Sequence, residues 1–338
     1  MLPALRNRAV PIGSRSAASR IQKEQAAMKT PVNTPRMNGT PRSRLGWLFL
    51  VPILTTPVQA QLPNLNIAVD SICLTWPVTV EECIVVCSKS PTGPWTPVPV
   101  PIQEADGQYQ AVVRCSDQQK YFRLAKGTCF VDDFEDGNID DWTVTFVDPA
   151  SEGDFIVEAT CGRLRIHGGR SGDYDPAVML SRKDLLFGDF ALAIDILGWH
   201  DEPDAGALVG LGGRLEAEPV FPKFAFQFGL VAFRMVDNSS HSAVVLGNRY
   251  RYPMDLVGEI QELPTVLDPG KDYRLVFSAV GREMSVQLHD LKTGTLVKAY
   301  SHSDAPLPPG HVAFSVGDYG LYTDFLFDNF IAVGLWPE

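Results

Sequence analysis

The fold is decided by the run CFVDDFEDG at residues 129–137, which is followed by Trp142. Its counterpart at the other end of the chain is FLFDNFIAV, residues 325–333. Between the two, short alternating runs rich in Val, Ile, Phe and Tyr recur, and clusters of Gly, Pro, Asp and Asn separate them. No stretch after residue 60 shows a helical period of useful length. This pattern is typical of an all-β sandwich or jelly roll.

The bracket formed by these two runs resembles the concanavalin A-like lectin/glucanase superfamily, in the broad laminin-G-like set of exported bacterial domains. The resemblance implies that the first and last strands pair in one sheet. We therefore expect residues 129–338 to form an antiparallel jelly roll. The strands expected between the two runs lie at residues 162–167, 190–197, 207–215, 224–236, 243–246, 272–280, 283–290, 296–301 and 311–316.

A smaller β-sandwich is expected to precede the jelly roll, at residues 61–128. The stretch LTWP at 74–77, Trp95 after a Gly-Pro turn, and YFRL at 121–124 resemble a fibronectin type III-like module of exported bacterial proteins. Asp106-Gly107 predicts a hairpin within it. The cysteines depart from that family's pattern, because such modules usually lack disulfides.

An export signal is predicted at residues 37–60. Basic residues precede the apolar run LGWLFLVPIL at 45–54, and VQA at 58–60 has the small residues of a cleavage site, so the mature chain is expected to begin at Gln61. The apolar run is about half of the ~20 residues that span a bilayer, which predicts no membrane insertion after cleavage. The expected location is extracellular or periplasmic.

The stretch at residues 1–36 is rich in basic residues and poor in aromatic ones, and it has no apolar period. It is interpreted as a disordered extension or as a mis-called start upstream of Met37. Residues 1–60 carry nine of the 29 Lys and Arg residues and one of the 40 Asp and Glu residues, which leaves a net charge of −19 on the expected mature chain. Such a surface repels phosphate backbones and argues against nucleic acid as a partner.

The chain has six cysteines, all after the predicted signal: Cys73, Cys83, Cys87, Cys115, Cys129 and Cys161. An even number in an exported chain favours disulfides. We expect Cys129 to pair with Cys161 and the other four to pair among themselves, in one of three connectivities.

Catalysis by the paired carboxylates of a glycosidase is not expected. In glucanases of this fold, the catalytic acids lie in a motif that resembles Glu-x-Asp-x-x-Glu on one strand. The nearest match in this sequence centres on Asp195. Ala193 and Gly198 stand where the two glutamates belong. The expected function is therefore non-catalytic recognition of a glycan or polysaccharide. The alternatives are a glycoside hydrolase or lyase with an atypical acid pair, and a structural or adhesive envelope protein.

Aromatic side chains in loop-like sequence are the candidate sugar-binding residues, because aromatic rings stack on the C–H faces of sugars. These candidates are Trp199, Tyr174, Tyr250 and Tyr252. The competing interpretation of each is a ring that covers the core. A solvent-open sheet face lined by aromatics would favour glycan binding, and a closed face would favour the structural alternative.

A structural calcium site is the one metal hypothesis. Jelly-roll carbohydrate-binding modules often place calcium between the first strand and an Asp of the last, which the resemblance transfers to Asp133, Glu135 and Asp328. These hard oxygen ligands suit Ca²⁺. The alternative is that the acids are exposed edge-strand and turn residues.

Overall fold

A computed structural model describes residues 71–78, 82–114, 120–146, 155–168, 177–199, 207–215, 223–224, 227–233, 242–251, 255–318 and 323–336. The predicted signal and the N-terminal extension lie outside these residues. Every regular element of the described residues is a β-strand, and none of them forms a helix long and apolar enough to cross a membrane. The chain from Leu65 onward forms one unit.

The small module is a pair of short sheets around its own core. One sheet has the antiparallel order β1-β5-β4, with β1 at Ser71–Pro77, β4 at Ile102–Ala105 and β5 at Gln108–Arg114. The other consists of β2 (Cys83–Ser88), β3 (Thr96–Pro97) and the first part of β6. The core between them contains Trp76, Val85, Ala111 and Val113. The expected hairpin at Asp106-Gly107 joins β4 to β5, with both residues at positive φ.

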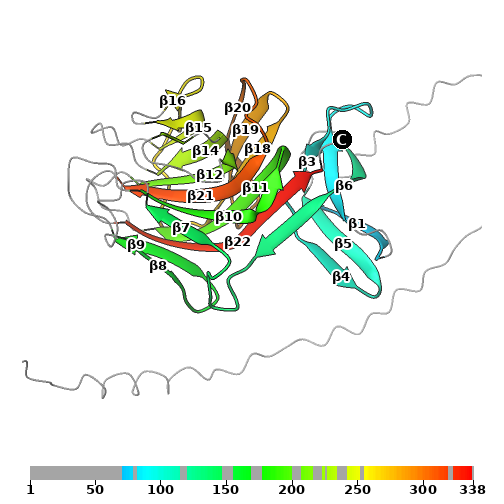
Figure 1. The fold of residues 1–338 in the computed structure, drawn as a ribbon, viewed down its shortest axis with the longest axis horizontal. Coiled ribbons are helices and arrows are strands. Elements are labelled where there is room, and N and C mark those ends of the chain that lie inside the picture. Colours follow the sequence, from blue (N-terminus) through cyan, green and yellow to red (C-terminus); the bar gives the residue numbers. More distant parts are fainter. Residues whose placement is uncertain are drawn as a thin grey trace, which may run out of the picture. The chain divides into compact units, whose positions relative to one another are not determined.

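Strand β6, Tyr121–Asp132, joins the small module to the jelly roll (Figure 1). Its first half pairs with β2, from Ser88↔Tyr121 to Cys83↔Lys126. Its second half pairs with the closing strand β22 (Thr323–Leu335), from Leu335↔Gly127 to Phe330↔Asp132. The predicted pairing of the first and last strands is thereby confirmed. The boundary expected at residues 128/129 falls inside β6, so one sheet runs through both parts of the chain.

Two antiparallel sheets make the jelly roll. The ten-stranded sheet has the path β20-β19-β18-β11-β22-β6-β2-β3, with β9 attached to β22 and β8 to β9. The nine-stranded sheet has the path β13-β15-β14-β12-β21-β10-β7, with β16 and β17 attached to β15. The strands not yet bounded are β7 (Thr143–Phe146), β8 (Phe155–Ala159), β9 (Leu164–Gly168), β10 (Ala177–Phe187), β11 (Asp189–Trp199), β12 (Ala207–Leu215), β13 (Lys223–Phe224), β14 (Gln227–Ala232), β15 (Ala243–Arg251), β16 (Asp255–Leu256), β17 (Gln261–Glu262), β18 (Tyr273–Val280), β19 (Glu283–Asp290), β20 (Leu296–Ser303) and β21 (Gly310–Asp318).

The main core lies between these sheets, because alternate residues of each strand point inward. Strand β18 shows the pattern clearly, with every second residue buried from Tyr273 to Ala279. The largest side chains that are fully buried there include Phe314 on β21 and Phe327 on β22, whose ring centroids are 5.7 Å apart. The structure is thus an all-β protein with an antiparallel jelly-roll sandwich, as predicted.

Strand β2 of the small module packs on the outer face of β11 and β22, although it belongs to the same ten-stranded sheet. Ile84 and Val86 of β2 pack against Ala193 of β11 and against Ile331 and Val333 of β22, and all five residues are buried. This cluster, which we call the docking cluster, is apolar because it is shielded on both sides.

The outer face of the nine-stranded sheet is also apolar and buried. Its cluster, which we call the outer cluster, lies on the side away from the main core and consists of Met179, Leu215, Phe228, Leu230, Val245 and Ala313. All six are at most 7 % exposed. This sheet face is therefore closed, unlike the open aromatic face that the sequence-based glycan hypothesis requires.

The expected disulfide between Cys129 and Cys161 is not formed. The five described cysteines, Cys73, Cys83, Cys87, Cys129 and Cys161, are free thiols, and Cys115 lies outside the described residues. Strand β6 aims the Cys129 thiol at the Val100 carbonyl, 3.8 Å away in the small module. Cys161 lies in the exposed β8–β9 turn beside Gly162, which contacts Glu135. The prediction rested on compartment chemistry and the even number of cysteines, which do not determine which residues the fold brings together.

Candidate functional site

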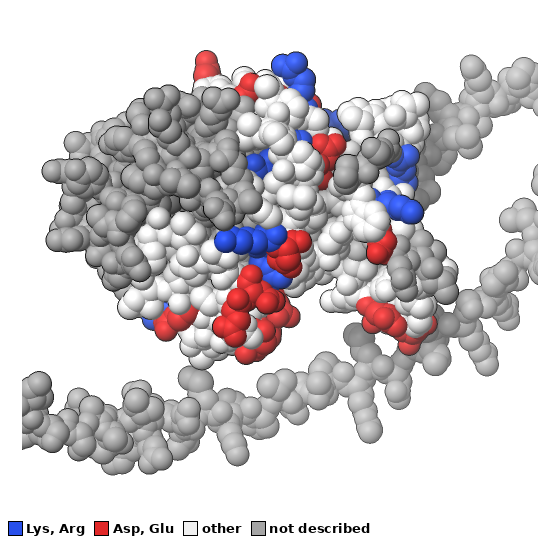
Figure 2. All heavy atoms as spheres, viewed as in Figure 1, with Lys and Arg blue, Asp and Glu red and all other residues white. Residues whose placement is uncertain are grey.

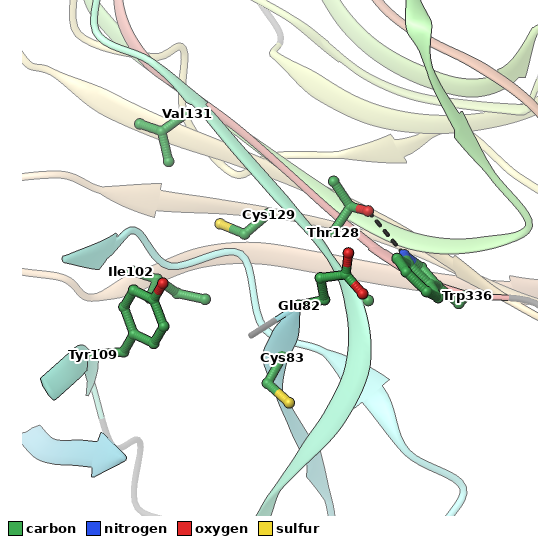
Figure 3. Close-up of a pocket in the computed structure, with 9 residues that line it drawn as sticks. Glu82, Cys83, Ile102, Tyr109, Thr128, Cys129, Val131 and Trp336 are labelled. Carbon is green, nitrogen blue, oxygen red and sulfur yellow. Dashed lines mark hydrogen bonds between the residues drawn. The ribbon is translucent and has the colours of Figure 1, made fainter. Parts of the chain in front are cut away.

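The candidate site is a pocket of about 520 Å³ where the small module meets the second half of β6 and the end of β22 (Figure 3). Two aromatic side chains, Tyr109 and Trp336, contribute to its walls. The other residues that line it are Glu82, Cys83, Ile102, Gly127, Thr128, Cys129 and Val131.

Close packing of three strands fixes the floor of the pocket. A Cβ atom at Gly127 would lie only 2.8 Å from the Ile84 Cδ1 atom and would meet the Gly334 carbonyl oxygen. The Gly127 N–H donates to the Glu82 carbonyl, 2.8 Å away, and Glu82 itself has a φ of 56°. Glycine at 127 therefore allows β2, β6 and β22 to approach one another, which places the Glu82 side chain beside the pocket.

Trp336 is held at the pocket rim by a side-chain hydrogen bond. Its Nε1–H donates to Thr128 Oγ1 at 3.0 Å, and its backbone N–H donates to the Lys126 carbonyl. The residue nevertheless remains 43 % exposed, and its pocket neighbour Val131 is 39 % exposed. A fixed and exposed indole beside a hydroxyl and a carboxylate combines apolar contact area with hydrogen-bonding groups.

The Cys129 thiol of the pocket is not suited to nucleophilic chemistry. Burial raises the pKa of the Cys129 thiol to about 11, although a backbone hydrogen bond at Ile102 acts in the opposite direction. A thiol with that pKa is almost entirely protonated at neutral pH, and the thiolate is the reactive form. Cys129 therefore contributes a small apolar surface to the pocket.

The four aromatic residues predicted to bind sugar do not line this pocket. Trp199 is the last residue of β11 and is 8 % exposed, with its ring 4.9 Å from that of Phe233 in the main core. It covers the core instead of facing a ligand. Tyr174 and Tyr252 lie outside the described residues. Tyr250 lies in β15, where its backbone pairs with Phe224.

The three predicted calcium ligands are not brought together as one site. No group of three or more His, Cys, Asp or Glu residues in the described part of the chain is close enough to hold a metal ion. Asp133 accepts a hydrogen bond from the Glu135 backbone N–H, and Asp328 accepts one from that of Asn329. Glu135 packs against Gly162. Each carboxylate is thus used locally, which agrees with the turn alternative.

Asp195 is locked into a structural network on the outer face of the ten-stranded sheet. It is 2 % exposed and accepts two hydrogen bonds from Arg274, at 2.6 and 2.7 Å, and one from Asn329 Nδ2 at 3.1 Å. Its neighbour across the strands is Asp328, whose pKa is raised by burial and by the charges of Asp195 and Asp133. A carboxylate held bidentately by a guanidinium cannot serve as a free acid or base.

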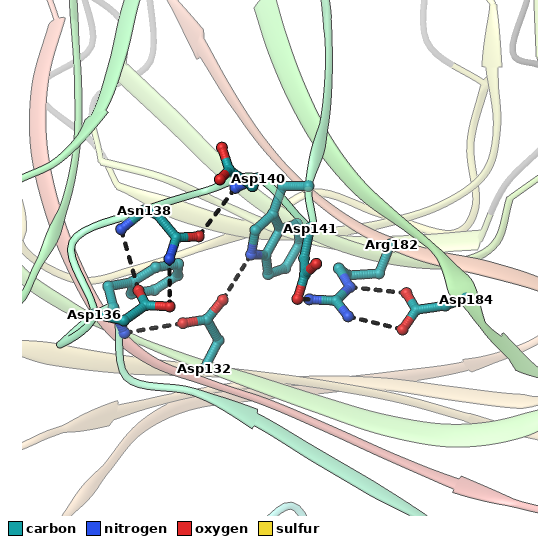
Figure 4. A network of polar contacts seen from close by, with 9 residues as sticks. Asp132, Asp136, Asn138, Asp140, Asp141, Arg182 and Asp184 are labelled. Atoms are coloured by element: carbon teal, nitrogen blue, oxygen red, sulfur yellow. Dashed lines mark hydrogen bonds and ion pairs between the residues drawn. The ribbon is translucent and has the colours of Figure 1, made fainter.

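The acidic loop after β6 is a second polar network (Figure 4). Asp132 accepts hydrogen bonds from the Trp142 Nε1–H at 2.7 Å and from the backbone of Phe134. Arg182 lies 4.3 Å above the Phe130 ring and binds Asp184 through two hydrogen bonds. Figure 2 shows the acidic side chains gathered over this loop, with basic ones beside them. The network fixes the loop and the core residue Trp142.

The strand order and register define the class of this protein, an antiparallel jelly-roll sandwich with a small β-module built onto one sheet. No known family model and no curated protein matches the chain. Among solved structures, it is similar to LamA from Zobellia galactanivorans in complex with laminaritriose and laminaritetraose (13 % identity, 60 % of this chain and 97 % of that chain, TM-score 0.42). It is also similar to the CBM2 module of the evolved Dit of Lactobacillus casei BL23 phage J-1 (10 % identity, 63 % of this chain and 100 % of that chain, TM-score 0.44). A third similar structure is lectin II from Ulex europaeus (12 % identity, 62 % of this chain and 99 % of that chain, TM-score 0.40).

Proposed function

We propose that the protein is an exported carbohydrate-binding protein that does not cleave its ligand, and that it binds in the pocket beside Trp336. The observation that carries the proposal is the exposed indole of Trp336, fixed through Thr128 in a pocket that also contains Tyr109. Aromatic rings contribute large contact areas against sugar C–H faces, and the hydroxyl and carboxylate groups at the rim supply hydrogen bonds to sugar hydroxyls.

Binding without cleavage is supported by the positions of the acidic residues Glu82 and Asp195. A glycosidase of the common type needs two carboxyl groups about 5 to 9.5 Å apart. Among the described residues that line the pocket, Glu82 is the only acid. Asp195, the residue nearest to a glucanase pattern in sequence, is held by Arg274. Asp328 lies across the strands from Asp195, but the Arg274 guanidinium holds Asp195 through two hydrogen bonds, so this pair of acids does not offer a free carboxylate base.

A structural or adhesive role is the second candidate, because one specific observation favours it. The outer cluster closes the face of the nine-stranded sheet with buried apolar side chains such as Phe228 and Leu230. When the outer faces of both sheets are buried, neither face offers an exposed surface on which a ligand could lie. The two candidates differ in whether the Trp336 pocket binds sugar.

Export, the fibronectin-like character of the small module and a calcium ion are separate parts of the hypothesis. The export signal predicts Gln61 as the first residue after expression in a secreting host, which N-terminal sequencing checks. A calcium ion would have to use Asp133 and Asp328, which act on each other electrostatically. Calcium that raises the melting temperature of the wild type and not of Asp328→Asn would support such an ion, and equal melting with chelator would exclude it.

The test of the binding proposal is a glycan array followed by calorimetry on the oligosaccharides that bind. We expect Trp336→Ala to weaken binding by roughly tenfold or more, equivalent to ~1.4 kcal/mol, and Trp336→Phe to retain part of the affinity because a ring remains. Leu186→Ala, at a 60 % exposed apolar residue outside the pocket, is the matched control. Equal affinities for wild type and Trp336→Ala would contradict the proposal.

A further inference from the structure

Four cationic or ionisable nitrogen side chains converge away from the pocket, between the small module and the β18–β19 hairpin. They are Arg114, Lys120, Arg274 and His289, which we call the basic cluster. Burial lowers the pKa of His289, and the positive charges of Arg274, Lys120 and Arg114 lower it further. A hydrogen bond to the Gly294 backbone acts in the opposite direction. Three cations from separate elements therefore act on one imidazole.

Strand register explains how these residues meet. Arg274 of β18 and His289 of β19 are directly paired in the ten-stranded sheet. Both lie on its outer face, because their neighbours Leu275 and Leu288 point into the main core. The Arg114 guanidinium at the end of β5 packs against Gly294 in the turn after β19. Lys120, just before β6, also acts on the Cys87 thiol of β2.

Two acids near the basic cluster, among the residues that the structure describes, are already engaged. Asp195 accepts both hydrogen bonds of the Arg274 fork. Asp290 accepts hydrogen bonds from the backbone N–H and the hydroxyl of Thr293, each at 2.8 Å, and so closes the β19–β20 turn. No ion pair within the described residues involves Arg114 or Lys120, and both side chains are exposed. Two cations are thus available to a ligand.

We infer that the basic cluster is an anion-binding site for the carboxylate or sulfate groups of an acidic polysaccharide. The inference rests on the proposed function in taking the ligand to be a glycan, and it adds the ligand's charge class and a second contact region. A guanidinium binds carboxylate and sulfate through paired hydrogen bonds, and an ammonium adds a point charge. His289 lies beside them but adds no positive charge, because its pKa is lowered and its Nε2 is engaged 3.1 Å from Gln287 Oε1.

The overall charge of the chain requires the basic cluster to act at short range. With a net charge of −11, the protein repels polyanions at long range, acidic polysaccharides among them. Binding therefore depends on direct contact, in which one anionic group enters the basic cluster while other parts of the sugar chain lie on the surrounding surface. The local positive charge then provides selectivity for acidic over neutral glycans.

The test compares a galacturonic acid hexamer, dextran sulfate and uncharged dextran by calorimetry at low and high salt. We expect the full-length protein to bind the two acidic probes, with affinity that falls as salt rises. The double variant Arg114→Glu/Lys120→Glu should lose roughly tenfold or more of that affinity. The control Lys183→Glu/Arg282→Glu makes the same charge change at exposed residues elsewhere and should lose little. Melting curves of both variants establish that each is folded.

The inference is overturned if the wild type does not bind the acidic probes, or if the two double variants lose the same affinity. It is also overturned if inorganic sulfate binds as tightly as the hexamer, because the site then takes a small anion only. Failure here is distinguishable from failure of the proposed function. Neutral glycan binding that depends on Trp336 would retain the pocket and reject the basic cluster, whereas acidic binding that ignores Trp336→Ala would do the reverse.

Discussion

The two outer sheet faces of the jelly roll are closed in different ways. On the ten-stranded sheet, β2 and β3 cover the face, and the covering leaves a pocket at Trp336 and a basic cluster at Arg274. On the nine-stranded sheet, the face is lined by the outer cluster, with Phe228 3 % exposed. The comparison shows that the pocket and the basic cluster form where the small module meets the sandwich, whereas the outer face of the nine-stranded sheet is apolar and buried.

The largest effect is expected from opening the closed face. Phe228→Ala removes a buried ring from the outer cluster and should lower the free energy of unfolding by about 3–5 kcal/mol. Chemical denaturation measures it. Val112→Ala, at a 57 % exposed position on β5, is the control and should change stability by no more than about 0.5 kcal/mol. A loss below ~1 kcal/mol at Phe228 would mean that this face is open in solution.

The next effect concerns the cover on the other face. Ile84 is fully buried in the docking cluster, and Ile84→Ala should cost about 2–5 kcal/mol. If the docking is as tight as the burial indicates, the whole jelly roll should lose stability in one transition, because β6 links both parts. Two separate unfolding transitions in the wild type would instead show that the small module unfolds alone.

A smaller effect is expected from the polar network beneath the cover. Arg274→Met leaves the buried Asp195 carboxylate with Asn329 as its remaining described side-chain partner. Breaking a buried pair costs several kcal/mol, and the 30 % exposure of the Arg274 side chain reduces this to about 2 kcal/mol. The double variant Arg274→Met/Asp195→Leu should recover most of the loss, since both charges are then gone. No recovery would assign the loss to packing alone.

Much of this architecture is predictable from the sequence, because alternation and turn residues are local signals. The strands at 207–215 and 283–290 were predicted with the correct bounds, and the pairing of the two bracketing runs with each other was also predicted. Strand β10 was missed, since the charged residues Arg182, Lys183 and Asp184 interrupt its pattern where the register shifts. Trp199 was placed in a loop, whereas β11 extends to that residue and turns its ring inward.

The candidate site could not be predicted from local sequence patterns, because it depends on contacts between residues far apart in the chain. Trp336 follows the last apolar run of the chain, and only the pairing of Leu335 with Gly127 brings it to the small module. Glu82 and Tyr109 reach the pocket through the docking cluster, which joins residues far apart in sequence. A terminal tryptophan beyond the closing strand was the one available signal. Burial of the nine-stranded face likewise depends on tertiary packing that composition does not reveal.

The smallest effect is a pH-dependent one at the edge of the polar network. The pKa of Asp328 is raised above its ordinary value by burial and by Asp195 and Asp133. The folded protein therefore holds this proton more tightly than the unfolded chain, and the charged form is unfavourable once the pH rises through the raised pKa. Asp328→Asn should raise the unfolding free energy at pH 7 by at most about 1 kcal/mol. The gain should vanish below pH ~4, the ordinary range of aspartate; a gain that persists there would contradict the charge explanation.

The most direct test of the central claim is a thiol footprint of the pocket. Cys83 and Cys129 line the pocket, whereas Cys73 and Cys161 are exposed outside it and serve as internal controls. Alkylation rates of all four are measured by mass spectrometry, with and without an oligosaccharide identified on the glycan array. We expect the bound sugar to slow alkylation of Cys83 severalfold and to leave Cys73 and Cys161 unchanged, whereas Cys129 is slow to react with or without sugar because its pKa is raised. Saturating ligand that leaves all four rates unchanged would contradict binding in this pocket.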